Sequence, residues 1–320
     1  MSASELSQLF SSPIRFDHYM MHALYDPLKG YYASKVSYTE DFITAPTHSE
    51  YQARATAGWL IDHEVKRLVE YGPGQGYWAQ DIVSNARCKN WVFDKYYMVE
   101  PSEALRALQS KALSSPPFIS KSSPKGLHCD AIIANEVLDA LPCRRFRWHK
   151  NELYEWYLVK GKIQWLPCHD GQVLEKIICY SANWDHQYDF EICDYDSLMQ
   201  SMCGLGARHI LLFDYGYHAE QYFHQSDETS RLKVIRQHQH VPFSLEQTGN
   251  QDLSTPVNWT DVEDSAARYG YAVKRFGSLM DFLLSYQAFS EVSQSYHVKE
   301  LMIPGGLGYT IQVMWLQQSR

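Results

Sequence analysis

Hydrophobic and polar positions follow a helical period in some stretches of the chain and a strand period in others. Apolar side chains at steps of three and four residues predict helices over residues 13–25, 48–65 and 77–87. Short apolar runs predict buried strands of a parallel sheet at residues 64–70, 96–100, 130–134 and 209–216. Because strands and helices alternate along the chain, we expect an α/β fold.

The second half of the chain shows shorter and more mixed patterns. Residues 144–166 alternate apolar and polar side chains, which predicts antiparallel strands added to the same sheet. Residues 170–205 have a mostly helical pattern, and residues 259–269 predict a further helix. Two last strands, at residues 272–276 and 309–316, are expected to close the sheet as an antiparallel pair. No linker separates two folding units, so we expect one domain.

Two polar stretches are predicted to cover a ligand site. Residues 31–46 combine turn residues with aromatic residues and suit a flap, whereas the long insertion at residues 217–256 suits a lid. The insertion contains His238 and His240, and a His-x-His pair could bind a metal. No acid or cysteine at ligand spacing accompanies the pair, so the sequence favours a solvated basic loop and no metal site.

Three glycines at every second position follow the first predicted strand. Gly72, Gly74 and Gly76 come shortly after Glu70, and a helix is predicted to begin at Tyr77. Glycine lets the backbone turn sharply and lets a ligand approach its amides, while the helix N-terminus favours a negative group. Tyr77 occupies the position of the third glycine of the dinucleotide fingerprint, which disfavours NAD. A glycine-rich connection without a ligand is the alternative reading.

Carboxylates end two further predicted strands. Glu100 follows the strand at residues 96–100, where a doubly wound fold places the acid that binds ribose hydroxyls, although it could also be an N-terminal helix charge. Asn135 and Glu136 follow the strand at residues 130–134. On a helical turn Glu136 and Asp139 would share one face and could hold a cation between them. A helix cap by Asn135 or a solvated acidic turn would explain the same residues.

Composition narrows the function classes. The chain has 320 residues and a net charge of −8, which argues against a general nucleic-acid binder. Its seven cysteines include no C-x-x-C pair, which indicates reduced thiols in the cytosol. Residues 1–12 lack the pattern of a secretion signal or a transit peptide, and no apolar stretch is long enough to span a membrane. We therefore expect a cytoplasmic protein.

Several motifs in a fixed order resemble one family, the MidA-like methyltransferases, which include the mitochondrial complex I assembly-factor protein arginine methyltransferases. The resemblance covers nearly the whole chain. The motifs are Pro13-Ile14-Arg15-Phe16, Gly30-Tyr31-Tyr32, Asp41-Phe42-Ile43-Thr44-Ala45-Pro46, Glu70 to Gly76, Val99-Glu100-Pro101-Ser102, Ala134-Asn135-Glu136 with Asp139-Ala140-Leu141-Pro142, Asp214-Tyr215-Gly216, and Gly249 with Asp252-Leu253.

The resemblance implies a Rossmann-like class I methyltransferase fold, with a seven-stranded, mostly parallel sheet, an N-terminal helical flap and an inserted β-hairpin and helical lid. It divides a single domain 1–320 into a cap at 1–63, a cofactor-binding core at 64–142, an insertion at 143–208 and a C-terminal half at 209–320. The implied cofactor is S-adenosyl-L-methionine (AdoMet), and the implied substrate is a protein arginine, in mitochondrial members that of a respiratory complex I subunit.

Site roles follow from the same resemblance. The implied cofactor-binding residues are Glu70, Gly72, Gly74, Gly76, Glu100 and Asn135. Because an arginine guanidinium is always cationic, carboxylates are needed to hold it beside a sulfonium, and Glu136 and Asp139 are the candidate catalytic residues.

The chain also departs from the family pattern within the flap and the lid. Glu40, Thr47-His48-Ser49 and Glu228-Thr229 replace the usual residues there. Two other readings therefore stay open. One is an assembly or interaction protein that binds the cofactor with weakened catalysis, and the other is a small-molecule methyltransferase.

Overall fold

The computed structural model describes residues 13–34, 50–180, 187–224, 231–237, 239–289, 301, 303 and 305–319. This part of the chain divides into two compact units. The large-sheet unit holds the described residues of 43–138, 196–216 and 262–320, and the small-sheet unit those of 1–42, 139–195 and 217–261. The division of a single domain into cap, core, insertion and C-terminal half stays a prediction.

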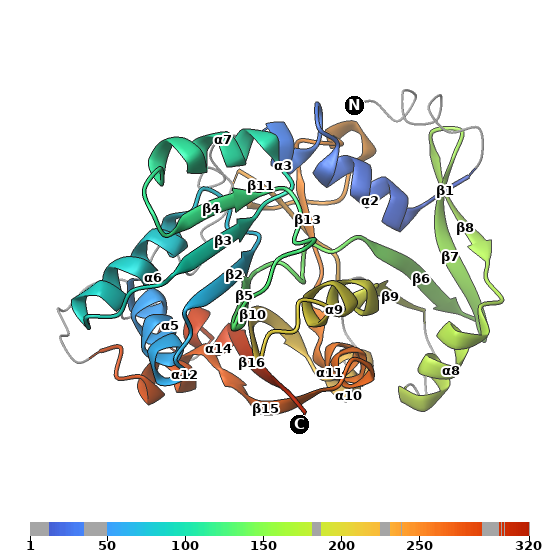
Figure 1. The fold of residues 1–320 in the computed structure, drawn as a ribbon. Coiled ribbons are helices and arrows are strands. Elements are labelled where there is room, and N and C mark those ends of the chain that lie inside the picture. Colours follow the sequence, from blue (N-terminus) through green and yellow to red (C-terminus); the bar gives the residue numbers. More distant parts are fainter. Residues whose placement is uncertain are drawn as a thin grey trace. The chain divides into compact units, whose positions relative to one another are not determined.

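Seven strands of the large-sheet unit lie in one sheet, in the order β15-β16-β10-β5-β2-β3-β4 (Figure 1). The strands from β10 to β4 pair in parallel, and β16 runs antiparallel to both of its neighbours. Their bounds are β2 Arg67–Tyr71, β3 Lys95–Val99, β4 Phe118–Lys121, β5 Ala131–Asn135, β10 His209–Tyr217, β15 Tyr271–Ser278 and β16 Ile311–Gln318. The expected α/β fold and the closing antiparallel pair are confirmed.

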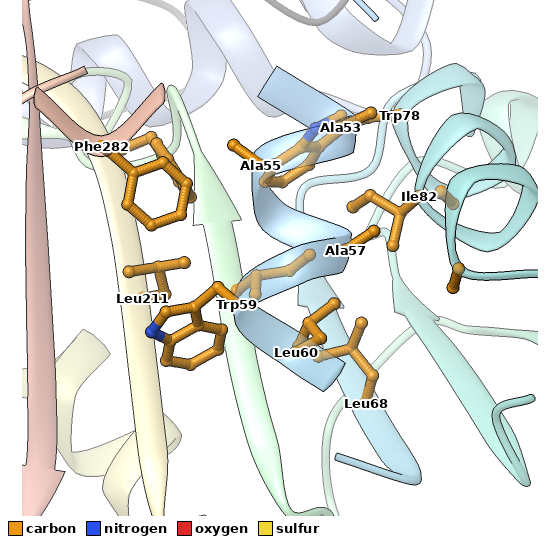
Figure 2. Packing of buried hydrophobic residues seen from close by; sticks show 14 of the residues in the cluster. Ala53, Ala55, Ala57, Trp59, Leu60, Leu68, Trp78, Ile82, Leu211 and Phe282 are labelled. Atoms are coloured by element: carbon orange, nitrogen blue, oxygen red, sulfur yellow. The ribbon is translucent and has the colours of Figure 1, made fainter. Parts of the chain in front are cut away.

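The core of this unit forms between the sheet and its helices. Helix α5 (Glu50–Asp62) is rich in alanine, and these small side chains let it pack closely on α6 (Tyr77–Cys88). Figure 2 shows Ala57 directed toward Ile82 of α6, while Trp59 lies toward Leu211 of β10. This packing places the first turn of α5 in the same core cluster as the start of α6.

Within the described residues, the helices predicted at residues 13–25, 48–65, 77–87 and 259–269 are confirmed over most of their length. In the small-sheet unit, α2 (Phe16–Tyr25) buries the apolar face that its pattern predicted. In the large-sheet unit, α7 (Glu103–Ala112) begins after Ser102, whose side chain accepts a hydrogen bond from the Leu105 backbone N–H. Of the predicted flap, only Tyr31–Ser34 lies within the described residues, where it forms α3.

The antiparallel strands of the small-sheet unit form a sheet of their own. Strands β6 (Cys143–His149), β7 (Glu152–Val159) and β8 (Lys162–Pro167) join β1 (Ile14–Arg15) and β9 (Tyr188–Cys193). The prediction that they extend the parallel sheet is therefore wrong, as is the helical prediction for the β9 segment. The reason is cross-strand pairing: Phe146 and Phe190 stack at 5.3 Å between ring centroids, directly opposite each other on β6 and β9.

The insertion after β10 contains short elements. Three of its strands form a small sheet in the order β12-β11-β13. A lid role stays a prediction, and His238 lies outside the described residues. The remaining elements are α8 Gly171–Tyr180, α9 Tyr195–Cys203, α10 Ala219–His224, β11 Lys233–Arg236, β12 Gln239–His240, η2 Leu245–Gln247, β13 Asp252–Ser254, β14 Val257–Asn258, α11 Trp259–Arg268, α12 Leu279–Ser285 and α14 Leu307–Thr310. Within the described ranges, no helix has both the length and the apolar character that a membrane span needs.

Candidate functional site

The glycine loop connects β2 to α6 in the large-sheet unit. Gly72, Gly74 and Gly76 have φ angles of +63°, +55° and +87°, a left-handed backbone that residues with a Cβ seldom adopt. A Cβ at Gly72 would lie 2.7 Å from Val137, and one at Gly76 would lie 2.7 Å from Leu113. A Cβ at Gly74 would meet no atom within 4 Å among the described residues. Gly74 is therefore the glycine whose open side can receive a ligand.

A buried glutamine holds the Gly74 peptide in place. Gln109 of α7 donates from Nε2 to the Gly74 carbonyl oxygen at 2.6 Å, and its Oε1 accepts from the Ser120 hydroxyl at 2.6 Å. Gln109 is fully buried, so these bonds satisfy polar atoms that water does not reach. Sequence reasoning did not assign this residue to the site, although a glutamine on the buried face of an amphipathic helix is a signal of such a role.

Glu100 lies at the carboxyl end of β3, beside the glycine loop. Its carboxylate accepts hydrogen bonds from the backbone N–H groups of Ser102, at 2.9 Å, and of Gly74. Burial raises the pKa of Glu100 to about 7, against the lowering effect of these two bonds. The bond from Ser102 supports the reading of Glu100 as a charge at the start of α7, and the bond from Gly74 places the carboxylate against the glycine loop. Its contact with a ribose stays a prediction.

Glu70 lies at the end of β2, inside the protein. It is 2% exposed, and the Tyr96 hydroxyl donates to its Oε2 at 2.8 Å. Burial raises the pKa of Glu70 to about 8, and the charge of Glu100 raises it further. Burial therefore favours the protonated form of the Glu70 carboxyl. The structure thus shows Glu70 supporting the strand end from within, and its proposed contact with the cofactor stays a prediction.

The turn after β5 carries Asn135 and Glu136. Glu136 has a φ of +50°, and its backbone N–H donates to the Phe213 carbonyl oxygen at 2.8 Å. The Asn135 amide accepts from Gln52 Nε2 at 2.7 Å and donates to Glu136 Oε1 at 3.4 Å. Residues 136–142 form bends and a turn, so the expected helical turn is wrong. The reason is the left-handed backbone at Glu136, which ends regular structure there.

A buried aspartate holds the same turn from β10. Asp214 is fully buried and accepts from the Leu138 N–H at 3.0 Å and from the Tyr215 N–H at 2.8 Å. Val137, between Glu136 and Leu138, packs against Gly72 of the glycine loop. The Glu136 turn and the glycine loop are thus neighbours within one unit.

Asp139 belongs to the small-sheet unit, whereas Glu136 belongs to the large-sheet unit. Asp139 is 8% exposed. The pKa of Tyr32 is raised mainly by burial, and the nearby charges of Asp252 and Asp139 raise it further. The Tyr32 hydroxyl donates to Asp252 Oδ1 at 2.8 Å. Sequence reasoning assigned no role to Asp252, because its bond to the half-buried Tyr32 joins residues that are distant in sequence.

Buried polar atoms without a hydrogen-bond partner among the described residues occur on α5 and α6 of the large-sheet unit. Gln52 Oε1, Thr56 Oγ1 and Trp78 Nε1 are buried, and none has a hydrogen-bond partner among the described residues. Together with the open side of Gly74 and the acid at Glu100, they fit a ligand with several polar groups. Across the described ranges no cluster of histidine, cysteine, aspartate and glutamate could hold a metal ion.

Comparison with known proteins identifies the cofactor that the family uses. A family model described as "Putative S-adenosyl-L-methionine-dependent methyltransferase" matches residues 54–277. The mitochondrial protein arginine methyltransferase NDUFAF7 homolog of Caenorhabditis elegans is 27% identical over 315 residues, covering 81% of this chain and 71% of that protein. Its Danio rerio relative is 23% identical over 302 residues, covering 80% and 69%.

A solved structure shares the fold. It is a protein of Burkholderia thailandensis, described as a "likely methyl transferase" bound to S-adenosyl-homocysteine, with a TM-score of 0.88 and 20% identity over 99% of this chain and 91% of that one. The family match covers the glycine loop, Glu100 and the Glu136 turn, so AdoMet is the cofactor whose fit the open Gly74 and the unpaired polar atoms support. The chain belongs to this family of S-adenosyl-L-methionine-dependent methyltransferases.

Proposed function

We propose that this methyltransferase acts on the guanidinium of an arginine in a protein substrate. The observation that carries the proposal is the carboxylate of Glu136, which lies in a turn packed against the glycine loop through Val137 and Gly72. Relatives at 23–27% identity are named protein arginine methyltransferases, which supports the same acceptor. A respiratory complex subunit is the acceptor that the family resemblance favours.

The chemistry explains why a carboxylate is needed. AdoMet supplies a methyl group on a sulfonium, and transfer to nitrogen is an in-line displacement that depends on alignment and exclusion of water. An arginine guanidinium is always cationic, so it approaches a second cation only where a carboxylate offsets the repulsion. Glu136 would accept charge-assisted hydrogen bonds from the guanidinium and fix one nitrogen toward the methyl carbon. Asp139, three residues later in the sequence, is the proposed second carboxylate.

The hydrogen bonds of the turn support this role for Glu136. The Glu136 backbone N–H donates to the Phe213 carbonyl oxygen, and the Leu138 N–H donates to Asp214. These bonds fix the backbone from which the Glu136 carboxylate extends. Asn135 donates to one carboxylate oxygen at 3.4 Å, which orients the group. A preorganised acceptor of this kind needs little rearrangement when the substrate binds.

The test is the variant Glu136→Gln, assayed with AdoMet on protein acceptors identified by mass spectrometry of methylarginine in a deletion strain. Replacing the carboxylate by an amide removes charge-assisted hydrogen bonds worth about 2–3 kcal/mol, so transfer should fall about 100-fold. AdoMet affinity, measured by calorimetry, should change little. Glu175→Gln on the exposed side of α8 makes the same chemical change and should leave both values unaltered.

Two results would contradict the proposal. Equal transfer by wild type and Glu136→Gln would remove Glu136 from the mechanism. AdoMet binding without methylarginine in any acceptor would favour an assembly protein, and methylation of a small metabolite would favour a small-molecule methyltransferase.

A further inference from the structure

Gln52 lies in the first turn of α5, where its side chain is fully buried in the large-sheet unit. Its Nε2 donates to Asn135 Oδ1 at 2.7 Å. Its Oε1 is buried too, and no described residue donates to it. An amide oxygen left without a donor in the interior is costly, so a group that supplies an N–H there would be bound favourably.

The neighbouring carboxylate supports the orientation of this amide. Asn135 directs its Nδ2 toward Glu136 Oε1 at 3.4 Å, because an amide oxygen there would face the carboxylate oxygen. Asn135 therefore presents Oδ1 on its other side, and Gln52 must offer its NH₂ to that oxygen. Gln52 thus donates to Asn135, and Asn135 donates to Glu136. In this series of hydrogen bonds Gln52 Oε1 is the acceptor that no described residue uses.

Two more unpaired polar atoms belong to residues near this amide. Thr56 lies one turn after Gln52 on the same face of α5, and its hydroxyl also lacks a partner among the described residues. Trp78 of α6 packs edge-on against Phe213 at 5.5 Å, and Phe213 is the strand partner of Asn135 in β10 and β5. Figure 2 shows the Trp78 side chain near the Ala53 end of α5.

We propose that Gln52 forms, with Asn135 and Glu136, a subsite for a cationic N–H group of the reactants, in which Gln52 Oε1 accepts the hydrogen bond. Two groups of the proposed reaction have this chemistry: the ammonium of the methionine part of AdoMet and the guanidinium of the acceptor arginine. The inference deepens the proposed function and rests on it for the second of these groups. Glu136 supplies the negative charge, and Gln52 supplies direction.

The experiment compares wild type with Gln52→Met, which keeps the side-chain length but removes both amide atoms. Binding of AdoMet and of methylthioadenosine, which lacks the amino-acid part, is measured by calorimetry. Binding of N-acetylarginine amide is measured by NMR titration in the presence of S-adenosyl-homocysteine. Loss of a hydrogen bond to a charged group should lower the affinity for one of the two cationic ligands about 10- to 100-fold.

The two arms identify the group. If the ammonium binds Gln52, Gln52→Met lowers the affinity for AdoMet and leaves the affinity for methylthioadenosine unchanged. If the guanidinium binds there, Gln52→Met lowers the affinity for N-acetylarginine amide and leaves the affinity for AdoMet unchanged. Both arms measure binding, so a protein that binds AdoMet through Gln52 but methylates no arginine would refute the proposed function and leave the subsite intact.

Matched variants separate the subsite from a structural role. Gln172→Met makes the same change on the exposed side of α8 and should alter neither affinity. Gln52→Glu loses the donor to Asn135 Oδ1 but keeps an oxygen acceptor and adds a negative charge, so it should bind the cationic ligand about tenfold more tightly than Gln52→Met does. It also supplies the binding measurement if Gln52→Met is unstable. Equal affinities of wild type and Gln52→Met for both ligands, or equal losses in Gln52→Glu and Gln52→Met, would overturn the proposal.

Discussion

The turn after β5 in the large-sheet unit and two arginines of β6 in the small-sheet unit, Arg144 and Arg147, both lie beside buried polar groups, yet they differ in how these groups are satisfied. Arg147 donates to both oxygens of Asp189, at 2.7 and 2.8 Å. Arg144 does the same with Glu155 at 2.7 and 3.0 Å. Near the β5 turn, by contrast, Gln52 Oε1 has no donor among the described residues.

The difference separates groups that hold the fold from groups that await a ligand. Two-bond pairs between an arginine and a carboxylate are complete within the protein, and removing one partner leaves a buried charge. A polar atom without a partner lowers stability in the free protein and is tolerated where binding satisfies it. We therefore expect changes near β6 to affect folding, and changes near the glycine loop to affect binding.

The largest effect is expected for Gly74→Val. The φ of +55° disfavours a β-branched residue, and the new side chain would occupy the open side of the loop. AdoMet affinity, measured by calorimetry, should fall more than about 100-fold, which is more than about 2.7 kcal/mol.

Gly126→Val is the matched control, because Gly126 has a φ of +77° and no described atom within 4 Å of an added Cβ. It should show a similar strain in unfolding experiments and unchanged AdoMet affinity. Unchanged binding in Gly74→Val itself would refute the assignment of the loop.

A large effect on folding is expected for Arg147→Met. Asp189 is 4% exposed, so the change leaves a nearly buried carboxylate without its two hydrogen bonds. The free energy of unfolding, measured in urea, should fall by about 2–3 kcal/mol, less than for a fully buried pair because Arg147 is partly exposed. AdoMet affinity of the folded protein should stay the same.

Arg268→Met tests the role of burial in that result. Arg268 pairs with Asp196, and both side chains are about half exposed, at 56% and 45%. Water can solvate the remaining carboxylate, so stability should change little. An equal loss in the two variants would mean that burial does not distinguish these pairs.

A smaller, pH-dependent effect is expected at Glu70. Its pKa is raised from 4.5 to about 8 by burial, so the folded state keeps a proton that the unfolded state releases above pH 4.5. Glu70 therefore costs stability progressively as pH rises from about 5 to 8. Glu70→Gln should gain stability relative to wild type as pH rises through this range, by about 1.4 kcal/mol for each pH unit.

Urea unfolding of both proteins at several pH values measures this gain. Glu103→Gln on the exposed side of α7 is the control, and its difference from wild type should not vary with pH. A constant difference between Glu70→Gln and wild type would show that Glu70 titrates alike in both states.

Local patterns determined much of the fold and part of the site. Continuous apolar runs predicted β2, β3, β5 and β10 with bounds close to the observed ones, because strands buried on both faces need such runs. The polar residues that follow these runs, Glu70, Glu100 and Asn135, were found for the same reason. The glycine spacing was readable because it reflects backbone angles, which a residue sets locally.

Other features followed only from tertiary structure. Gln52 and Gln109 enter the site through hydrogen bonds to Asn135 and Gly74, which lie 83 and 35 residues away along the chain. The left-handed Glu136, the separate sheet of the β6 arginines and the strand at β9 likewise depend on partners distant in sequence. The sequence by itself determined the glycine loop and a set of candidate AdoMet-binding residues at the ends of strands, because both are set by local pattern. Tertiary packing decided which of their polar atoms are satisfied within the protein and which are left for a ligand, because hydrogen bonding in the interior depends on neighbours in space.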